Sequence, residues 1–300
     1  MPVAVDKETE LAIVRRAYAK QILSLVDVDD ARIEAAFAHV PREHYLGPGP
    51  WEGFRYLGKY HTTPDDDPVY VYTDRLFGLI PAKGVNNGQP SLHAALMANA
   101  GVGVGEHVVH VGAGVGYYTA ILAHIVGPGG RVTAIEFDPD LAARARTNLA
   151  HVPNVTVIVG DACTLSFDPA DVIYANAAFS CVPLSWLDGL RDGGRLILPM
   201  GSRVGLRDGA SGPFDMAKFM LLYKSQVVFR IERRGAEFHV TPGIPAAFIS
   251  AEGADDASDA ALVAALEKGG ARNVTRVYRG EDVPDERCWL RGKGWCLAYS

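Results

Sequence analysis

Cysteine is scarce in this sequence, and so are long apolar runs. The four cysteines in 300 residues are scattered without a CxxC pair, which predicts neither a zinc site nor a disulfide framework. The first ten residues are acidic and polar rather than basic and then apolar, and no run of about 18 apolar residues occurs. We therefore expect no metal site, no membrane partner and a cytoplasmic location.

An excess of positive charge is also absent. The formal net charge of -6 at pH 7 argues against nucleic acid as the principal partner. Hydrophobic residues make up 48% of the chain and charged residues 21%, which is enough apolar material for a full core. The composition predicts one large globular domain with additions.

The N-terminal part is expected to form helices and a loop. Apolar residues recur mostly at helical spacing over residues 11–25, and a second helix is expected over residues 31–38. Residues 47–68 are rich in Gly, Pro and aromatic residues and end in three consecutive aspartates, which indicates a long surface loop.

The centre of the chain alternates short β-branched runs with helical segments, the pattern of βαβ units in a parallel sheet. Strands are expected over residues 107–111, 131–137, 155–159, 171–175 and 195–199, and helices over residues 117–126, 141–151 and 183–190. Asp138 is a plausible N-cap of the second of these helices, with Pro139 at its first position. The strand-like runs that follow indicate an antiparallel edge, over residues 219–223, 227–232 and 238–240.

We predict a Rossmann-like, doubly wound, mostly parallel sheet of seven strands within residues 81–250. A helical segment precedes it over residues 1–80, and a C-terminal α+β extension follows over residues 251–300. The extension is expected to contain a helix and two strands, over residues 259–268, 274–278 and 295–299. Its Trp289 and Trp295 could line a pocket or pin the chain end to the core.

A glycine-rich turn follows the first central strand. Gly112, Gly114 and Gly116 form a GxGxG run, and a helix is expected to begin near Tyr117. Glycines there let the backbone approach a ligand where any side chain would collide. The same run could be a purely structural turn, or it could bind a dinucleotide.

Three further features favour a nucleoside-containing cofactor. Glu136 ends the second strand, where a carboxylate can accept hydrogen bonds from ribose hydroxyls. Asp161 and Ala162 follow the third strand, and the aspartate could accept from a purine amine or merely cap a turn. The fourth strand leads into a small-residue loop that contains Asn176. All four loops are expected to converge on the crevice where open α/β sheets bind ligands.

A nicotinamide enzyme would use the same first loop and the same acidic residue, and is the natural competitor. The Gly-Asp-Ala motif and further motifs along the chain argue against it. They are Val40-Pro41-Arg42-Glu43, Tyr72-Thr73-Asp74, Gln89-Pro90, Gly116-Tyr117 with Thr119-Ala120, Gly130-Arg131-Val132 with Ile135-Glu136, Asn154-Val155 through Gly160-Asp161, and Gly193-Gly194-Arg195-Leu196 with Pro199 and Gly201. Over about residues 11–249 these motifs resemble the protein-L-isoaspartate O-methyltransferase family.

The resemblance implies S-adenosylmethionine as the cofactor and a carboxylate of a peptide, protein or small molecule as the methyl acceptor. It implies that Gly112 and Gly114 lie against the methionine part, that Glu136 holds the ribose, and that Asp161 holds the adenine. The remaining members of the expected cofactor set are His110, Gly116, Tyr117, Ala162 and Asn176. Residues 85–90 would form the acceptor loop, and its catalytic candidates are Asn86, Asn87, Gly88 and Gln89.

The chain departs from the family's pattern at two positions. The family usually has Ser where this chain has Gly88, and an acidic residue where it has His110. Asn86 and Asn87 could replace the missing hydroxyl with amide donors, or simply tolerate a left-handed turn. His110 could be a functional change or a satisfied histidine at the end of a buried strand.

Two residues of the helix after the acceptor loop have plain structural interpretations. Ser91 is expected to be a first-turn residue of that helix, and His93 to pack or face solvent.

A carboxylate acceptor is already ionised at pH 7, so its methylation needs no general base. Catalysis would then come from holding the oxygen in line with the methyl group and stripping it of water. Three alternatives stay open: a repurposed family member that acts on a peptide or small-molecule natural product, an enzyme that uses the cofactor for another reaction such as cyclisation, and a non-catalytic binder of S-adenosylmethionine.

Overall fold

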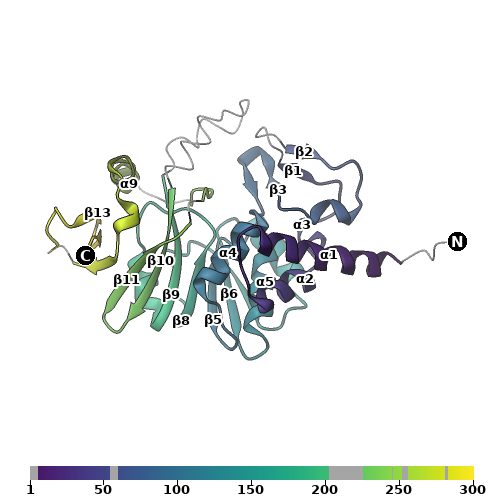
Figure 1. The fold of residues 1–300 in the computed structure, drawn as a ribbon, viewed down its shortest axis with the longest axis horizontal. Coiled ribbons are helices and arrows are strands. Elements are labelled where there is room, and N and C mark those ends of the chain that lie inside the picture. Colours follow the sequence, from purple (N-terminus) through teal and green to yellow (C-terminus); the bar gives the residue numbers. More distant parts are fainter. Residues whose placement is uncertain (1–5, 55–59, 203–225, 245, 252–255, 281–282) are drawn as a thin grey trace.

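The fold is known from a computed structural model that describes residues 6–54, 60–202, 226–244, 246–251, 256–280 and 283–300. The N-terminal helices lie at one end of a central sheet and the C-terminal extension lies at the other (Figure 1). The two chain ends are therefore far apart, and the sheet between them carries the loops of interest.

Ten strands of the described residues form this sheet, in the order β13-β14-β12-β11-β10-β9-β8-β5-β6-β7. Its parallel part consists of β5 (His107–Val111), β6 (Arg131–Glu136), β7 (Val155–Val159), β8 (Ala170–Ala175) and β9 (Leu190–Gly201). Every residue of β5 is buried, as expected for a central strand covered on both faces. The predicted Rossmann-like sheet is confirmed.

The strand order reverses beside β5. The chain runs outward from β5 through β6 to β7, and then returns to β8 on the other side of β5. The loops that leave β5 and β8 therefore start at the switch point of the sheet's carboxyl edge, the place where open α/β sheets bind ligands.

Three helices connect the parallel strands at the predicted places. They are α5 (Tyr117–Val126), α6 (Pro139–Asn148) and α7 (Leu184–Gly189), and α4 (Pro90–Ala100) precedes β5. The Asp138 carboxylate accepts hydrogen bonds from the backbone N–H groups of Asp140 and Leu141, and Pro139 occupies the first helical turn. This confirms the predicted start of α6.

The N-terminal segment contains α1 (Lys7–Ser24), α2 (Ala31–His39), α3 (Glu43–Leu46) and the short 3-10 helix η1 (Pro68–Val71). Phe37 of α2 packs edge-on against Tyr117 and Tyr118 of α5, which fixes the helices to the sheet domain. The expected loop over residues 47–68 is not entirely irregular, because β1 (Glu52–Phe54) and β2 (Tyr60–Thr62) pair within it.

A second small hairpin precedes α4. It consists of β3 (Gly78–Ile80) and β4 (Val85–Asn86), with the 3-10 turn η2 (Pro81–Lys83) between them. This hairpin delivers the chain to the predicted acceptor loop.

The C-terminal third continues the same sheet with antiparallel strands. They are β10 (Gln226–Arg234), β11 (Glu237–Pro242), β12 (Arg276–Arg279), β13 (Cys288–Gly292) and β14 (Trp295–Ala298). The seven predicted strands are thus extended by three from the C-terminal extension, of which β13 was not expected. The strand expected over residues 219–223 lies outside the described residues.

The helix of the extension, α9 (Asp256–Lys268), and the 3-10 turn η3 (Ala271–Asn273) precede β12. Trp289 and Trp295 are both almost fully buried, at 3% and 4% exposure, in the core that this part of the sheet shares. The Trp289 indole N–H donates to the Gly269 carbonyl at 2.9 Å. Of the two roles considered for these tryptophans, they pin the chain end to the core.

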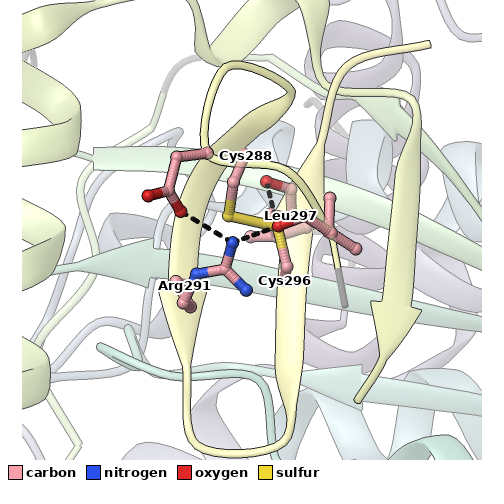
Figure 2. Close-up of a disulfide and its surroundings, with 6 residues drawn as sticks. Cys288, Arg291, Cys296 and Leu297 are labelled. Atoms are coloured by element: carbon pink, nitrogen blue, oxygen red, sulfur yellow. Dashed lines mark hydrogen bonds and ion pairs between the residues drawn. A yellow bond between two sulfur atoms is a disulfide. The ribbon is translucent and has the colours of Figure 1, made fainter. Parts of the chain in front are cut away.

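The expectation that the cysteines form no disulfide is wrong for one pair. Cys288 and Cys296 are bonded to each other across the β13-β14 hairpin (Figure 2). The two cysteines are eight residues apart, and the bond crosses the hairpin diagonally, because Cys288 lies opposite Ala298 and Cys296 lies opposite Arg291. Cys163 and Cys181 remain thiols. The scattered cysteines were one reason to expect a cytoplasmic location, and this bond removes that reason.

Replacement of both Cys288 and Cys296 by Ser should lower the free energy of unfolding by about 2 kcal/mol, because the closed loop is short and restricts the unfolded chain only modestly. Thermal melting with and without dithiothreitol measures this, since the reductant should shift the wild type and leave the double variant unchanged. Denatured, unreduced protein should titrate two thiols, and a count of four would contradict the bond.

Candidate active site

The turn after β5 keeps its backbone free of side chains. Gly112, Gly114 and Gly116 all have left-handed φ angles, of +76°, +57° and +93°. A Cβ at Gly112 would come within 3.4 Å of the Asn176 backbone, and one at Gly116 within 2.6 Å of the Leu149 side chain. The left-handed conformation therefore favours glycine at all three positions, and close approach adds to this at Gly116.

Glu136, at the end of β6, lies beside this turn. One of its carboxylate oxygens accepts from the Gly114 N–H at 2.6 Å and the other accepts from the Asp138 N–H at 3.0 Å. The residue is 7% exposed, and burial raises the pKa of its carboxyl while the two N–H donors oppose that rise. Each oxygen has a further lone pair, so the carboxylate can still accept from hydroxyl groups.

The four strand-end loops do converge. The Gly112 N–H donates to Ile135 of β6 at 2.9 Å, and the Gly160 N–H donates to the Glu136 carbonyl at 2.9 Å. The Asn176 N–H donates to the Val111 carbonyl at 2.8 Å, which holds the fourth loop against the first. These bonds hold the four strand ends beside one another, as expected, and the binding of a ligand there stays a prediction.

The third loop is shaped by its own side chains. An Asp161 carboxylate oxygen accepts from the Cys163 N–H at 2.9 Å, so this residue acts as a turn former whatever else it binds. Ala162 is buried, and its carbonyl accepts from the Trp186 indole at 2.9 Å. An open glycine backbone, a buried carboxylate and this ordered loop together fit a cofactor that carries a ribose and a purine.

The predicted acceptor loop follows β4 and turns at Gly88. The Asn86 side chain accepts from the Gly88 N–H at 2.9 Å and donates to the Gly84 carbonyl at 3.1 Å, so it shapes the loop. The left-handed residue is Gly88 itself, with φ +75°, and neither asparagine has a positive φ. Of the two roles considered for the asparagines, tolerance of a left-handed turn is therefore not the one observed.

Asp74 fixes the start of α4 behind this loop. Its carboxylate accepts from the Ser91 N–H at 2.8 Å, from the Ser91 hydroxyl at 2.6 Å and from the Gln89 side-chain amide at 2.8 Å. Ser91 is thus the first-turn helix residue that the sequence indicated. Gln89 is turned toward Asp74.

Asn87 is bonded to a buried cation. Its side-chain oxygen accepts from the Phe77 N–H at 2.8 Å and from the Arg42 guanidinium at 3.3 Å. Arg42 is fully buried and also donates to the carbonyls of Val71, Thr73 and Arg75. Within the described residues, the Asn87 amide nitrogen has no hydrogen-bond partner.

One hydrogen bond joins the acceptor loop to the cofactor half. The Tyr118 hydroxyl, in the first turn of α5, donates to the Gly88 carbonyl at 3.1 Å. Burial raises the pKa of the Tyr118 phenol well above its usual range, so it stays protonated and can donate. The loop is therefore held next to the helix that begins at the glycine turn.

Two buried histidines lie behind the loop. His93 Nδ1 is 2.7 Å from the Tyr174 hydroxyl, and His110 Nδ1 is 2.8 Å from the Thr119 hydroxyl. Both rings are fully buried, so His93 packs rather than facing solvent. Burial lowers the pKa of His110 to about 3 and that of His93 well below its usual range, which makes both neutral at pH 7.

The sequence reasoning assigned no role to Arg42, Tyr118 or Tyr174. Arg42 lies in one of the motifs that carry the resemblance. Its position between two apolar helical segments could have indicated a buried cation. Tyr118 and Tyr174 carry no such signal, because their importance depends on tertiary contacts. No group of His, Cys, Asp or Glu side chains among the described residues could hold a metal ion, and none of the helices searched there could span a membrane.

The strand order, the glycine turn and the buried carboxylate at the end of the second strand fit a class I S-adenosylmethionine-dependent methyltransferase, and comparison with known proteins decides against the nicotinamide enzyme. The model of the protein-L-isoaspartate(D-aspartate) O-methyltransferase family matches residues 20–208. The chain therefore belongs to that family.

Individual relatives agree with the family assignment. A protein-L-isoaspartate O-methyltransferase of Thermotoga maritima is 29% identical over 63% of this chain and 56% of its own length. Protein-L-isoaspartate O-methyltransferase 2 of Archaeoglobus fulgidus is 31% identical over 60% of this chain and 82% of its own length. The match thus spans little more than half of the Thermotoga protein.

Solved structures support the same fold. A protein-L-isoaspartate O-methyltransferase superposes with a TM-score of 0.60 at 25% identity, over 79% of this chain and 66% of the other. A Plasmodium falciparum structure titled a putative enzyme of this kind, in complex with S-adenosyl-L-homocysteine, gives a TM-score of 0.58 at 18% identity, over 79% and 97%.

The neutral state of His110 predicts a pH dependence of stability. Its folded pKa lies below its unfolded value of about 6.5, so the stabilisation is complete above pH 6.5 and is lost as pH falls toward 3. Urea unfolding between pH 7 and 4.5 measures the free energy of unfolding at each pH. His110→Asn should make its decline toward acid pH shallower by about 1.4 kcal/mol per pH unit. The exposed His151→Asn is the control. Equal slopes for wild type and His110→Asn would contradict a neutral buried imidazole.

Proposed function

We propose that this chain transfers a methyl group from S-adenosylmethionine to the free carboxylate of an aspartyl or isoaspartyl residue in a peptide or protein. The observation that carries the proposal is the bond from Tyr118 to Gly88, which places the acceptor loop beside the glycine turn. The family assignment and the Plasmodium falciparum structure in complex with S-adenosyl-L-homocysteine support the same cofactor.

The strand-end loops are proposed to hold the cofactor. When bound, S-adenosylmethionine supplies an electrophilic methyl group on a sulfonium. Gly112 and Gly114 would leave room for its methionine part, Glu136 would accept from its ribose hydroxyls, and Asp161 with Ala162 would border the adenine. His110, Gly116, Tyr117 and Asn176 belong to the same proposed set, in which Tyr117 and His110 are buried below the turn and Asn176 covers it.

A carboxylate acceptor suits the electrostatics of the loop. The guanidinium of Arg42 is fully buried, and its bonded partners are carbonyl and amide oxygens rather than a carboxylate. Asp74 interacts with this cation at longer range, and a further anion near the guanidinium would be attracted through the low-dielectric interior, where the attraction is little screened. The neighbouring His93 and His110 are neutral and do not add competing charge.

The residues around the acceptor would position it rather than remove a proton. An ionised carboxylate needs no general base, and no residue of the loop is suited to be one. Asn86 shapes the turn at Gly88, Asn87 offers an unpartnered amide, and Gln89 with Asp74 fixes the start of α4. Their contribution is proximity and exclusion of water, for which effective molarities of about 10⁵ M are attainable.

A second candidate is favoured by one observation. Gly88 offers no hydroxyl at the place where the family usually carries serine, so the acceptor could be a carboxylate of a modified peptide or small molecule. Use of the cofactor for cyclisation would release methylthioadenosine, and a non-catalytic binder would release no product at all. The net charge of -6 supports a partner other than nucleic acid.

A cytoplasmic location also belongs to the proposal. It predicts that the fold tolerates reduction of the Cys288–Cys296 pair, because that compartment keeps most thiols reduced.

The proposal predicts transfer of labelled methyl from S-adenosylmethionine to an isoaspartyl peptide, to its normal aspartyl twin, or to both. The product should be base-labile, as a carboxyl ester is, and S-adenosylhomocysteine should appear in equal amount. Cofactor binding without labelling of either peptide would exclude both as acceptors. Formation of methylthioadenosine instead would identify the cyclisation alternative.

Glu136→Ala should weaken S-adenosylmethionine binding by about 10- to 100-fold, because hydrogen bonds to a charged group contribute about 1.5–3 kcal/mol each. Isothermal titration calorimetry measures this directly. Glu267→Ala removes an exposed glutamate of α9 and should bind the cofactor as the wild type does. Unchanged affinity in the Glu136 variant would place the ribose elsewhere.

A further inference from the structure

Two buried polar atoms beside Gly88 lack partners among the described residues. They are Nε2 of His93, which is fully buried, and Nδ2 of Asn87, whose residue is 5% exposed. A buried polar group without a hydrogen bond costs about 1–3 kcal/mol, so native structures rarely leave one unsatisfied without a reason. Nε2 of His93 faces Gly88 and Nδ2 belongs to the residue before it, so a ligand bound at this loop would satisfy both atoms.

The His93 ring occupies the space that a side chain at position 88 would take. A Cβ built on Gly88 would lie 2.3 Å from His93 Nε2 and 2.9 Å from its Cδ2. The left-handed φ of +75° at Gly88 disfavours a side chain as well. The imidazole therefore brings a polar atom to the place where a residue 88 side chain would otherwise have brought one.

The ring is held rigidly in that place. It stacks on Tyr118, with ring centroids 3.7 Å apart and planes inclined by 21°, and its Nδ1 is bonded to the Tyr174 hydroxyl. Burial raises the pKa of the Tyr174 phenol well above its usual range, so the phenol keeps its proton. We take this protonated phenol as the donor to Nδ1, which puts the imidazole proton on Nε2, the atom that faces Gly88.

We infer that His93 is an acceptor-binding residue, which donates its Nε2–H to one oxygen of the substrate carboxylate while the Asn87 amide donates to the same group. The inference rests on the proposed carboxyl methyltransferase function and deepens it. The site would then be specific for a carboxylate that two neutral donors hold, the His93 imidazole and the Asn87 amide. Such donors fix the oxygen's direction without the ion pair that would make it a poorer nucleophile.

His93 is not a base in this scheme. The titratable and charged groups around it are Tyr118 stacked on its face, Tyr174 at its Nδ1, and His110 and Arg42 at longer range. The desolvated ring, with a cation nearby, stays neutral across the physiological range. The rate of methyl transfer should therefore show no step between pH 6 and 8 that His93 substitutions remove.

The direct test compares His93→Leu and His93→Gln with the wild type on the best carboxylate acceptor. The leucine variant should raise the acceptor KM about 10-fold or more and leave S-adenosylmethionine affinity within about twofold, while glutamine, which keeps an N–H donor, should recover part of the loss. His151→Leu, an exposed histidine far along the chain, is the matched control. An unchanged acceptor KM in His93→Leu, or an equal loss of cofactor affinity, would overturn the inference.

A pair of substitutions tests the shared space directly. Gly88→Ser alone should cost at least about 10-fold in kcat/KM, because its Cβ collides with His93. His93→Ala combined with Gly88→Ser makes room and restores a hydroxyl, and should be more active than either single variant. A double variant whose kcat/KM is as low as that of the worse single variant would contradict the idea that His93 takes the place of a side chain at position 88.

If the leucine variant does not fold, ¹⁵N NMR of the wild-type histidines takes its place. The His93 signals should show a proton on Nε2, and its resonance should shift when an acceptor peptide is added with S-adenosylhomocysteine. An Nδ1-protonated or unresponsive ring would overturn the inference. Failure of the wild type to methylate any carboxylate would instead contradict the proposed function, so the two failures are distinguishable.

Discussion

The hydrogen bond from the Tyr118 hydroxyl to the Gly88 carbonyl is the constraint on which the arrangement of the site depends. Tyr118 lies in the first turn of the helix that begins at the glycine turn, so its position is set by the cofactor half of the sheet. Its ring stacks on His93 and packs edge-on against Phe37 of the N-terminal helices. One side chain thus ties together the turn, the acceptor loop and the helical cover.

The electrostatics of the site follow from the same packing. Tyr174 lies between the two buried histidines, with ring centroids 6.0 Å from His93 and 5.7 Å from His110. The two departures from the family's pattern, at positions 88 and 110, therefore meet in one cluster. Since both imidazoles are neutral, the ionisable side chains bonded to the loop are Arg42, a buried cation, and Asp74, whose carboxylate holds Gln89. A carboxylate acceptor is already ionised and needs no base.

The sequence predicted the parallel strands and their helices closely, because β-branched runs and caps are local signals. The boundaries of β5, β7 and α5 agree with the expectation, and Asp138 caps α6 as predicted. The β13 strand and the Cys288–Cys296 bond were missed because they depend on a hairpin register that no motif encodes. Composition alone indicated a loop where β1 and β2 pair.

The site was predictable in outline and not in its contacts. The glycine turn, Glu136 and the acceptor loop are each recognisable from residue type and spacing. His93 and Arg42 are buried, and the His93 ring occupies the space of any side chain at Gly88. These contacts depend on how distant segments of the chain pack. A histidine three residues into a helix carries no sequence signal for such a position.

The most direct test of this account is a crystal structure of the protein with S-adenosylhomocysteine and an isoaspartyl or aspartyl peptide. The account predicts the peptide carboxylate within hydrogen-bonding distance of His93 and Asn87, with the cofactor against Gly112 and Glu136. A carboxylate bound away from the Gly88 loop, with the cofactor in place, would contradict it.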